Sequence, residues 1–461
     1  MNMRPVAIAA VVGVATVWAG GTWVTGGRVR SALQAQAAAW QPKAGAPQPM
    51  FRIVKADYEK GFMSATRTLT LAFGCDSDAP TLTWRDRIQH GPLPGFAGLG
   101  AARIDSELVL TDTQRAELKK LTGQDQFQAT LRTVVGLRGD SKTWVEVPAF
   151  SLQGPDQSRL DFKGLSGLLS LDAGGGARYE LSLPAYSVST PPSGPAPGIL
   201  IRLTGAKFKG EGLAPLWWAF SGKGSGSLQG MELQLASAEG QARPAFTLQD
   251  LSYTQDGSLS NGLYSASVDM KGKGTAAGKA LEAVSMRFSM KNLHADSYAG
   301  FIRSAISASC PTEGADPQQE AQRVLEPLKA LLPHNPSISL DALKLTLGGQ
   351  TMSLSYSLGT QGVNAEDLKA PSLMPVLLKK THLKAGFEVP MAMLVELAAL
   401  SGKPVPPEVI DKGVEQAQAQ GVLVRTGDVL SANIEMGGGS LKVNGKAMPL
   451  PGMPPVAPDK P

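Results

Sequence analysis

The sequence predicts a β-dominated α+β protein, in which an N-terminal transmembrane helix precedes one or more long antiparallel sheets with a few short helices. Three observations predict this fold: an uncharged segment near the N-terminus, apolar residues that alternate with period two, and many turn-forming residues. The 461 residues include 52 glycines and 33 prolines, and only 18% are charged. Such a composition indicates a folded chain with many turns, and its length suggests two or three domains or one long repetitive β architecture.

Residues 5–27 contain no charge, whereas Arg4 and Arg28 flank them. This segment is rich in Ala and Val, and as a helix it would span roughly 35 Å, enough for a hydrocarbon core of about 30 Å. Trp18 and Trp23 lie toward its far end, where indole rings favour the membrane interface. We therefore expect residues 1–27 to form a transmembrane anchor; the alternative is a cleaved signal peptide.

The orientation rests on the shortness of the N-terminus, which normally stays in the cytoplasm while a long domain is translocated. Arg28, Arg30 and Lys43 follow the span, so the positive-inside rule alone does not favour an exported body. We expect a single-pass protein of the bacterial inner membrane with its body in the periplasm. Residues 28–49 read as a helical extension up to Trp40 and then a Pro-rich linker.

Alternating runs dominate the rest of the chain. Leu343, Leu345 and Leu347 precede Gly348-Gly349, and a second alternating run follows, which predicts a β-hairpin. A second hairpin is predicted over residues 430–443, and Asn444-Gly445 predicts a further tight turn. Other predicted strand segments are Thr68–Phe73, Trp144–Ser151, Tyr179–Val188, Ile199–Thr204, Met231–Leu235, Tyr264–Met270 and Val284–Met290.

Three helices are predicted in the body, over Pro317–Leu332, Met391–Leu400 and Pro407–Gly421. Linker-like residues at Thr190–Gly198 and Ser309–Pro317 suggest the domain boundaries. The predicted regions are an N-terminal β-rich region (50–195), a middle β-rich region (196–310), a C-terminal α+β region (311–448) and a Pro-rich tail (449–461).

No motif of an enzyme or a metal site is present. We assign no catalytic, cofactor-binding or metal-binding residue, expect no cofactor, and predict that the protein is not an enzyme. The four histidines, His90, His294, His334 and His382, are scattered. The net charge of +5 is spread along the chain, so no nucleic-acid partner is expected.

Several other residues have two interpretations, and for each the structural one is preferred. Cys75 and Cys310 are either two buried thiols, which we favour, or a disulfide that an oxidising periplasm would permit. Lys271–Gly274 reads as a turn, and Asp76 and Asp78 read as a solvated turn. Trp217-Trp218 either packs in a core or forms the lip of an apolar groove.

Four segments together resemble the YdgA-like family of bacterial envelope proteins of unknown function. They are the tryptophan-rich Trp18–Gly26, the Tyr-x-x-Gly element in Asp57–Ser64, the His-Gly-Pro turn in Gln89–Pro94, and the final strand with its Asn-Gly turn in Gly439–Leu450. The resemblance implies an anchored periplasmic protein without established catalysis. It supplies no accepted active site, so no functional residue is transferred to this chain.

Two functions are consistent with these patterns. A long sheet with one apolar face beside a bilayer could bind or transfer lipid, a layout similar to that of taco-shaped, AsmA-like envelope proteins. The alternative is a structural or protein-interaction scaffold of the envelope, acting through self-association or another envelope protein. The expected partners are therefore the inner membrane, through residues 5–27, together with lipid or protein.

Overall fold

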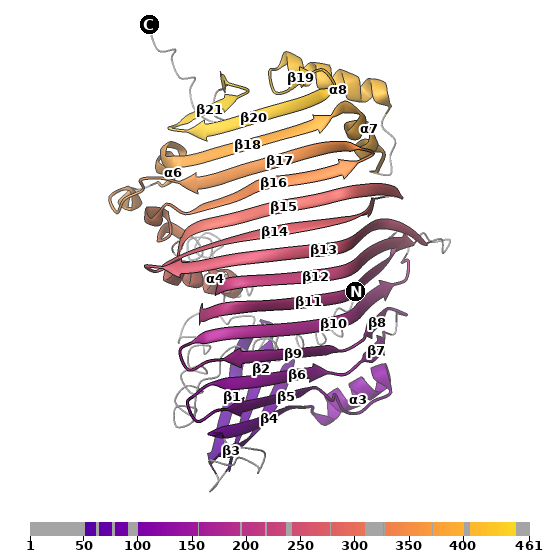
Figure 1. Ribbon diagram of the computed structural model, residues 1–461, viewed down its shortest axis with the longest axis vertical. Coiled ribbons are helices and arrows are strands. Elements are labelled where there is room, and N and C mark those ends of the chain that lie inside the picture. The colour runs from indigo at the N-terminus through magenta and orange to yellow at the C-terminus, as the bar shows by residue number, and fades with distance from the viewer. Residues whose placement is uncertain are drawn as a thin grey trace. The chain divides into compact units, whose positions relative to one another are not determined.

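The computed structural model describes residues 51–60, 64–75, 79–90, 100–154, 156–193, 196–216, 219–236, 242–276, 278–308, 326, 328–370, 372–400 and 406–448. The predicted anchor, its extension and the Pro-rich tail lie outside these residues. In the part of the chain so described, no helix has the length and apolar character needed to cross a membrane. The described chain is dominated by antiparallel strands, with few helices (Figure 1).

The chain divides into two compact units. The first contains residues 1–242 and 300–324, and the second contains residues 243–299 and 325–461. Residues 190–198, predicted as an interdomain linker, instead connect two strands of the first unit that pair along their whole length. The division itself falls near residue 242 and inside α4 (Ala295–Ala308).

The first unit is built from strands in sequential hairpins with one helix. Its strands pair in the order β1-β2-β3-β4-β5-β6-β9-β10-β11-β12, always antiparallel, with the short β7 and β8 extending the lines of β6 and β9. The elements are β1 (Phe51–Lys60), β2 (Ser64–Phe73), β3 (Thr81–His90), β4 (Ala102–Val109), α3 (Asp112–Thr122), β5 (Thr130–Val135), β6 (Ser141–Val147), β7 (Phe150–Gln153), β8 (Arg159–Phe162), β9 (Leu165–Leu171), β10 (Gly176–Thr190), β11 (Gly198–Leu216) and β12 (Ala219–Ala236).

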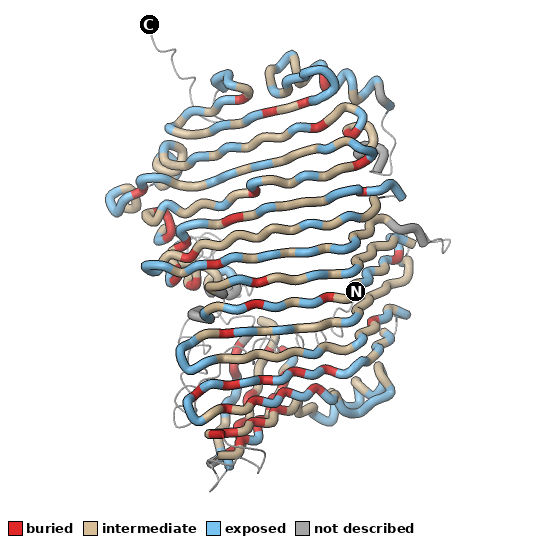
Figure 2. Tube along the Cα trace, viewed as in Figure 1, coloured by how far each residue is buried: buried red, intermediate tan, exposed pale blue. Residues whose placement is uncertain are grey.

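The N-terminal part of this sheet curls over its own core. Ile53 on β1 belongs to the same buried cluster as Leu131 on β5 and Val145 on β6, although several strands separate them in the pairing order. In Figure 1, β1 to β3 pass behind β4 to β6. Burial along β6 alternates strictly between buried and exposed residues, and Figure 2 shows buried residues concentrated on these strands. The sheet thus covers its own apolar face.

Buried polar residues lie within this curled region. Asp86 is fully buried, and its Oδ2 accepts a hydrogen bond of 2.6 Å from Nε of Arg67 on the neighbouring strand. Thr133 and Thr143 are also buried and share a hydrogen bond between their hydroxyls. Both pairs join adjacent strands and reduce the cost of burying polar groups.

The segment Trp144–Ser151, predicted as one strand, is interrupted at Pro148. It forms β6 and β7, and the opposing line is broken at Gly164 between β8 and β9. Proline cannot donate to the strand ladder, and Gly164 has a φ of +97°, which suits glycine. Pro184 on β10 and Gly205 on β11, with a φ of +63°, continue this irregularity across the sheet. The prediction was therefore wrong in treating the segment as continuous.

The strands of the second unit are also antiparallel. Its strands pair in the order β13-β14-β15-β16-β17-β18-β20-β21-β22, and β19 also pairs with β20. The elements are β13 (Ala242–Ser260), β14 (Leu263–Ala276), β15 (Lys279–His294), η3 (Leu332–His334), β16 (Ser337–Leu347), β17 (Gln350–Thr360), η4 (Asp367–Lys369), α6 (Met374–Lys380), β18 (Thr381–Pro390), α7 (Met391–Leu400), α8 (Pro407–Ala419), β19 (Val424–Thr426), β20 (Val429–Gly437), β21 (Ser440–Val443) and β22 (Lys446–Met448).

The predicted hairpins are confirmed. β16 and β17 are joined by Gly348-Gly349, whose φ values of +58° and +75° suit a tight type I′ connection. β20 and β21 form the second hairpin, and Asn444-Gly445 turns the chain into β22 with positive φ at both residues. The helices predicted at Met391–Leu400 and near Pro407 are confirmed as α7 and α8.

Some predictions were wrong or fall elsewhere. Lys271–Gly274 is part of β14 rather than a turn. A Cβ on Gly274 would lie only 1.9 Å from the backbone oxygen of Thr247, so these glycines permit close approach of neighbouring strands. Most of the helix predicted over Pro317–Leu332 lies outside the described residues. Of those described, Glu326, Leu328 and Lys329 are helical, and the last, Leu332, begins η3. α3, α4 and α6 were not predicted.

The favoured interpretation of two free thiols was also wrong, because Cys75 is disulfide-bonded. Cys310, the other cysteine of the chain, lies outside the described residues. Spacing in the sequence carries no information on whether two cysteines meet in space.

We predict that Asp86→Ala lowers the free energy of unfolding of the first unit by about 3–5 kcal/mol, because it leaves the buried Arg67 guanidinium without its carboxylate. Urea unfolding followed by intrinsic fluorescence measures this change. The double variant Arg67→Met/Asp86→Leu should recover most of the loss. Removing the exposed pair Arg178–Glu211 should cost at most about 1 kcal/mol, and an equal loss there would contradict the prediction.

Candidate apolar binding surface

The second unit presents a regular array of apolar side chains on one face of six adjacent strands. Residues that pair directly across antiparallel strands lie on the same face. Three cross-strand rows on β14, β15, β16, β17, β18 and β20 contain only apolar or aromatic residues, and we call them the apolar grid. The rows are Ala266–Met290–Ile338–Leu358–Leu383–Met436, Val268–Phe288–Leu340–Tyr356–Ala385–Ile434 and Met270–Met286–Leu343–Leu354–Phe387–Ala432.

A β-bulge keeps all of β16 in register with the grid. The apolar residues of this strand are even-numbered up to Leu340 and odd-numbered from Leu343. The pairing with both neighbouring strands shifts at the same place, around Asp341 and Ala342. The extra residue of the bulge turns the odd-numbered leucines to the same face as the even-numbered apolar residues before it. Leu343 and Leu345 consequently share a face with Ile338 and Leu340.

The apolar grid is only partly covered. Of its members only Leu340 and Ala432 are buried, whereas Ile338 and Leu358, which pair directly, are each 38% exposed. The other members have intermediate exposure, as the predominance of that class over these strands in Figure 2 illustrates. Contiguous exposed apolar surface is a common feature of binding sites, so the apolar grid is a candidate binding surface.

Helices cover the rows at one end of these strands. Met393 of α7 and Val414 of α8 pack with Leu281, Leu347 and Leu430 in one buried cluster. α7 begins directly at the end of β18, and α8 begins at Pro407, a residue type that suits a helix start. The apolar grid begins on the strands where the cover by α7 and α8 ends.

The opposite face of the same strands is polar. Ser353, Ser355 and Ser357 alternate with grid residues on β17, and Arg287 Nε lies 2.6 Å from Asp269 Oδ1 on the neighbouring strand. Apart from the β16 bulge, the strands therefore alternate between an apolar face and a polar one.

A smaller apolar surface of the same kind lies on β7, β8, β10, β11 and β12 of the first unit. Its two rows are Phe150–Phe162–Tyr186–Leu203–Met231 and Leu152–Leu160–Val188–Ile201–Leu233, and the pair Ile199–Leu235 extends it. Exposure rises across the rows from Leu160, at 3%, to Ile199 and Leu235, at 41% each. Burial raises the pKa of the Tyr186 hydroxyl, so it remains neutral and adds no charge here.

Both apolar surfaces consist of aliphatic and aromatic side chains. Their members supply no nucleophile, acid or base apart from the tyrosine hydroxyls. Four methionines belong to the apolar grid, and their flexible, polarizable side chains adapt to ligands of variable shape. Among the described residues, no group of three or more His, Cys, Asp or Glu side chains could hold a metal ion.

The residues noted in the sequence are mostly dispersed. His90 ends β3 and His382 lies near the start of β18. Asp76, Asp78, Trp217 and Trp218 lie outside the described residues.

Two of the histidines do meet. The rings of His294 and His334 stack with centroids 4.3 Å apart, and His294 Nδ1 shares a hydrogen bond with Ser297 Oγ. Burial, and then the nearby His294, lower the pKa of His334. This stack of parallel rings joins the end of β15 to η3. The sequence did not predict it, because the two histidines are far apart along the chain.

The family model described as "Bacterial protein of unknown function (DUF945)" matches residues 1–451. The chain is also 26% identical over 193 residues to Protein YdgA of Escherichia coli (strain K12), and this alignment covers 38% of each chain. These matches confirm the resemblance to the YdgA-like family that the sequence motifs indicated.

We predict that the second unit loses stability as the pH falls below about 6.5, the ordinary histidine value. Because the folded state lowers the pKa of His334, the unfolded state takes up the proton first, and stability falls until the folded pKa is passed. Urea unfolding at a series of pH values measures the loss. His334→Phe keeps an aromatic ring on His294 but does not titrate, so this variant should lose less stability on acidification. An unchanged pH dependence would contradict the prediction.

Proposed function

The chain belongs to the DUF945 family of bacterial proteins of unknown function, and on this premise we propose that its sheets hold the acyl chains of lipids on their partly exposed apolar faces. The observation that carries the proposal is the apolar grid of the second unit, in which three rows cross six strands without a charged residue. The apolar rows of the first unit support the same interpretation.

The dimensions of the grid suit an acyl chain. Strands lie about 4.8 Å apart, so a row of six spans roughly 24 Å. An acyl chain occupies about half of a hydrocarbon core of about 30 Å, or roughly 15 Å. A lipid chain can therefore lie along a row within the grid. Each methylene removed from water contributes about 0.8 kcal/mol, a gain that ordering the chain partly offsets.

Placement beside a membrane would give these surfaces access to lipid. We propose that residues 5–27 anchor the chain in the inner membrane and that the body lies in the periplasm. The uncharged segment supports the anchor, and the disulfide of Cys75 supports an oxidising compartment.

A scaffold function has one specific observation in its favour. Among the described strands, β1 pairs along one edge only, with β2, and Val54 on it is 49% exposed. An open edge of this kind can accept a strand from another protein. We rank it second because β1 offers a single strand edge, whereas the grid extends over six strands.

To test the proposal, the full-length chain would be incubated with phospholipid that carries a photoreactive acyl chain and then mapped by peptide mass spectrometry. We expect labelling on peptides from β15, β16, β17 and β18. The variant Ile338→Gln/Leu358→Gln places two amides in the most exposed row and should reduce labelling several-fold.

The matched control is Ser355→Gln/Ser357→Gln, which adds the same groups to the polar face of β17 and should leave labelling unchanged. Thermal unfolding verifies that both variants remain folded. Labelling that spread evenly over the chain, or that fell equally in both variants, would overturn the proposal.

A further inference from the structure

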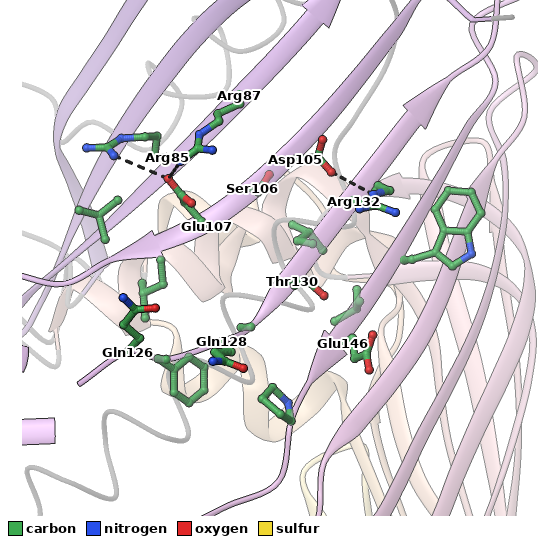
Figure 3. Close-up of a pocket in the computed structure, with 18 of the residues that line it drawn as sticks. Arg85, Arg87, Asp105, Ser106, Glu107, Gln126, Gln128, Thr130, Arg132 and Glu146 are labelled. Atoms are coloured by element: carbon green, nitrogen blue, oxygen red, sulfur yellow. Dashed lines mark hydrogen bonds and ion pairs between the residues drawn. The ribbon is translucent and has the colours of Figure 1, made fainter. Parts of the chain in front are cut away.

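A hollow lies on the outer face of β3, β4, β5 and β6 in the first unit, opposite the core. It has a volume of about 1420 Å³, and the loop that follows α3 also lines it. Five arginines border it, Arg85, Arg87, Arg103, Arg115 and Arg132, together with the carboxylates of Asp105, Glu107, Asp125 and Glu146. Figure 3 labels Arg85, Arg87 and Arg132 among them. We infer that this arginine hollow binds a phosphate-bearing group.

Four of the arginines form two clusters that each carry surplus positive charge. Arg85 Nη1 and Arg87 Nη2 lie 3.6 and 2.8 Å from the same oxygen of Glu107. Arg103 Nε and Arg132 Nε lie 2.8 and 2.9 Å from the two oxygens of Asp105. Each carboxylate thus has two guanidiniums beside it, so each cluster holds one positive charge more than its own carboxylate neutralises. With Asp125 and Glu146 included, the five arginines still exceed the four carboxylates that line the hollow.

The surplus donors face the hollow. Arg132 uses only Nε with its protein partner, and its side chain is 57% exposed; Arg85 is 42% and Arg87 66% exposed. A guanidinium has five N–H donors in a planar fork, which matches the oxygens of a phosphate in bidentate geometry. Figure 3 shows Arg85 and Arg87 flanking the Glu107 carboxylate, and Arg132 beside Asp105 on the next strand.

Asp105 remains charged and so fixes its two arginines. Burial raises the pKa of this carboxyl, but hydrogen bonds and charges from Arg103 and Arg132 outweigh burial and lower it. Arg103 Nε is buried and has no well-aligned acceptor in spite of the short distance to Asp105. The cationic side of the hollow is therefore held in place before any ligand arrives, which reduces the cost of binding.

Apolar groups adjoin the arginines. Trp144 is 44% exposed and pairs directly across the strands with Arg132, so both lie on one face, and Phe127 also lines the hollow. The phosphate source is thus either a lipid headgroup, for which an indole beside arginine suits the membrane interface, or a soluble phosphate compound. This inference does not depend on the proposed function.

The test uses the full-length chain in a neutral detergent and measures binding by microscale thermophoresis. One arm titrates inorganic pyrophosphate. The other titrates mixed micelles that contain phosphatidylglycerol, with phosphatidylcholine as the zwitterionic reference. The variant Arg85→Gln/Arg132→Gln removes one guanidinium from each cluster and leaves each carboxylate with an arginine partner, so the fold should be retained. We expect at least about tenfold weaker binding.

The control is Arg178→Gln, which removes an exposed, ion-paired arginine from a different part of the same unit and should not change the affinity. Arg132→Lys keeps the charge but loses the fork and should weaken binding less than the double variant. Binding in the pyrophosphate arm identifies a soluble phosphate ligand, and binding only to phosphatidylglycerol identifies a headgroup. Absence of binding in both arms, or an equal loss with Arg178→Gln, would overturn the inference.

Discussion

The fold depends on one constraint: an antiparallel sheet with an apolar face must cover that face, and this chain has few helices with which to do so. The first unit covers much of its face by curling, so that Ile53 on β1 meets Val145 on β6. The second unit covers only one end of its strands, where α7 and α8 pack over Leu281 and Leu347. What remains is the partly exposed apolar grid, and its location follows from where the cover ends.

Curling also determines where polar groups can lie. Asp86 and Arg67 are both buried in the curled sheet, where pairing with each other offsets much of the cost of removing their charges from water. The arginines of the neighbouring strands project outward and remain hydrated, so their ion pairs contribute little to stability. The same sheet thus places a structural ion pair on one face and a set of available guanidinium donors on the other.

The sequence alone predicted the strands and hairpins well, because alternation and Gly-Gly turns are local signals, as at Leu343–Leu347. It did not predict α3, although Thr111 and Gln114 form a capping box there. For the apolar grid, the sequence predicted only that the sheet has an apolar face. It did not predict which residues form each row, because that depends on the register between strands. The stack of His294 on His334, the disulfide of Cys75 and the arginine hollow depend on contacts between distant residues, which periodicity does not encode.

The bulge on β16 indicates that the sequence keeps the apolar grid continuous even where this disturbs the strand pairing. A strand that simply continued past Leu340 would place Leu343 and Leu345 on the polar face, opposite Ser353 and Thr351. The inserted residue at Asp341 and Ala342 disrupts the ladder locally, yet it returns the following leucines to the apolar face. A sheet that needed only solubility would have polar residues at these positions. The chain instead accepts a local defect and keeps three apolar rows continuous across six strands, which is the geometry that an extended apolar ligand requires.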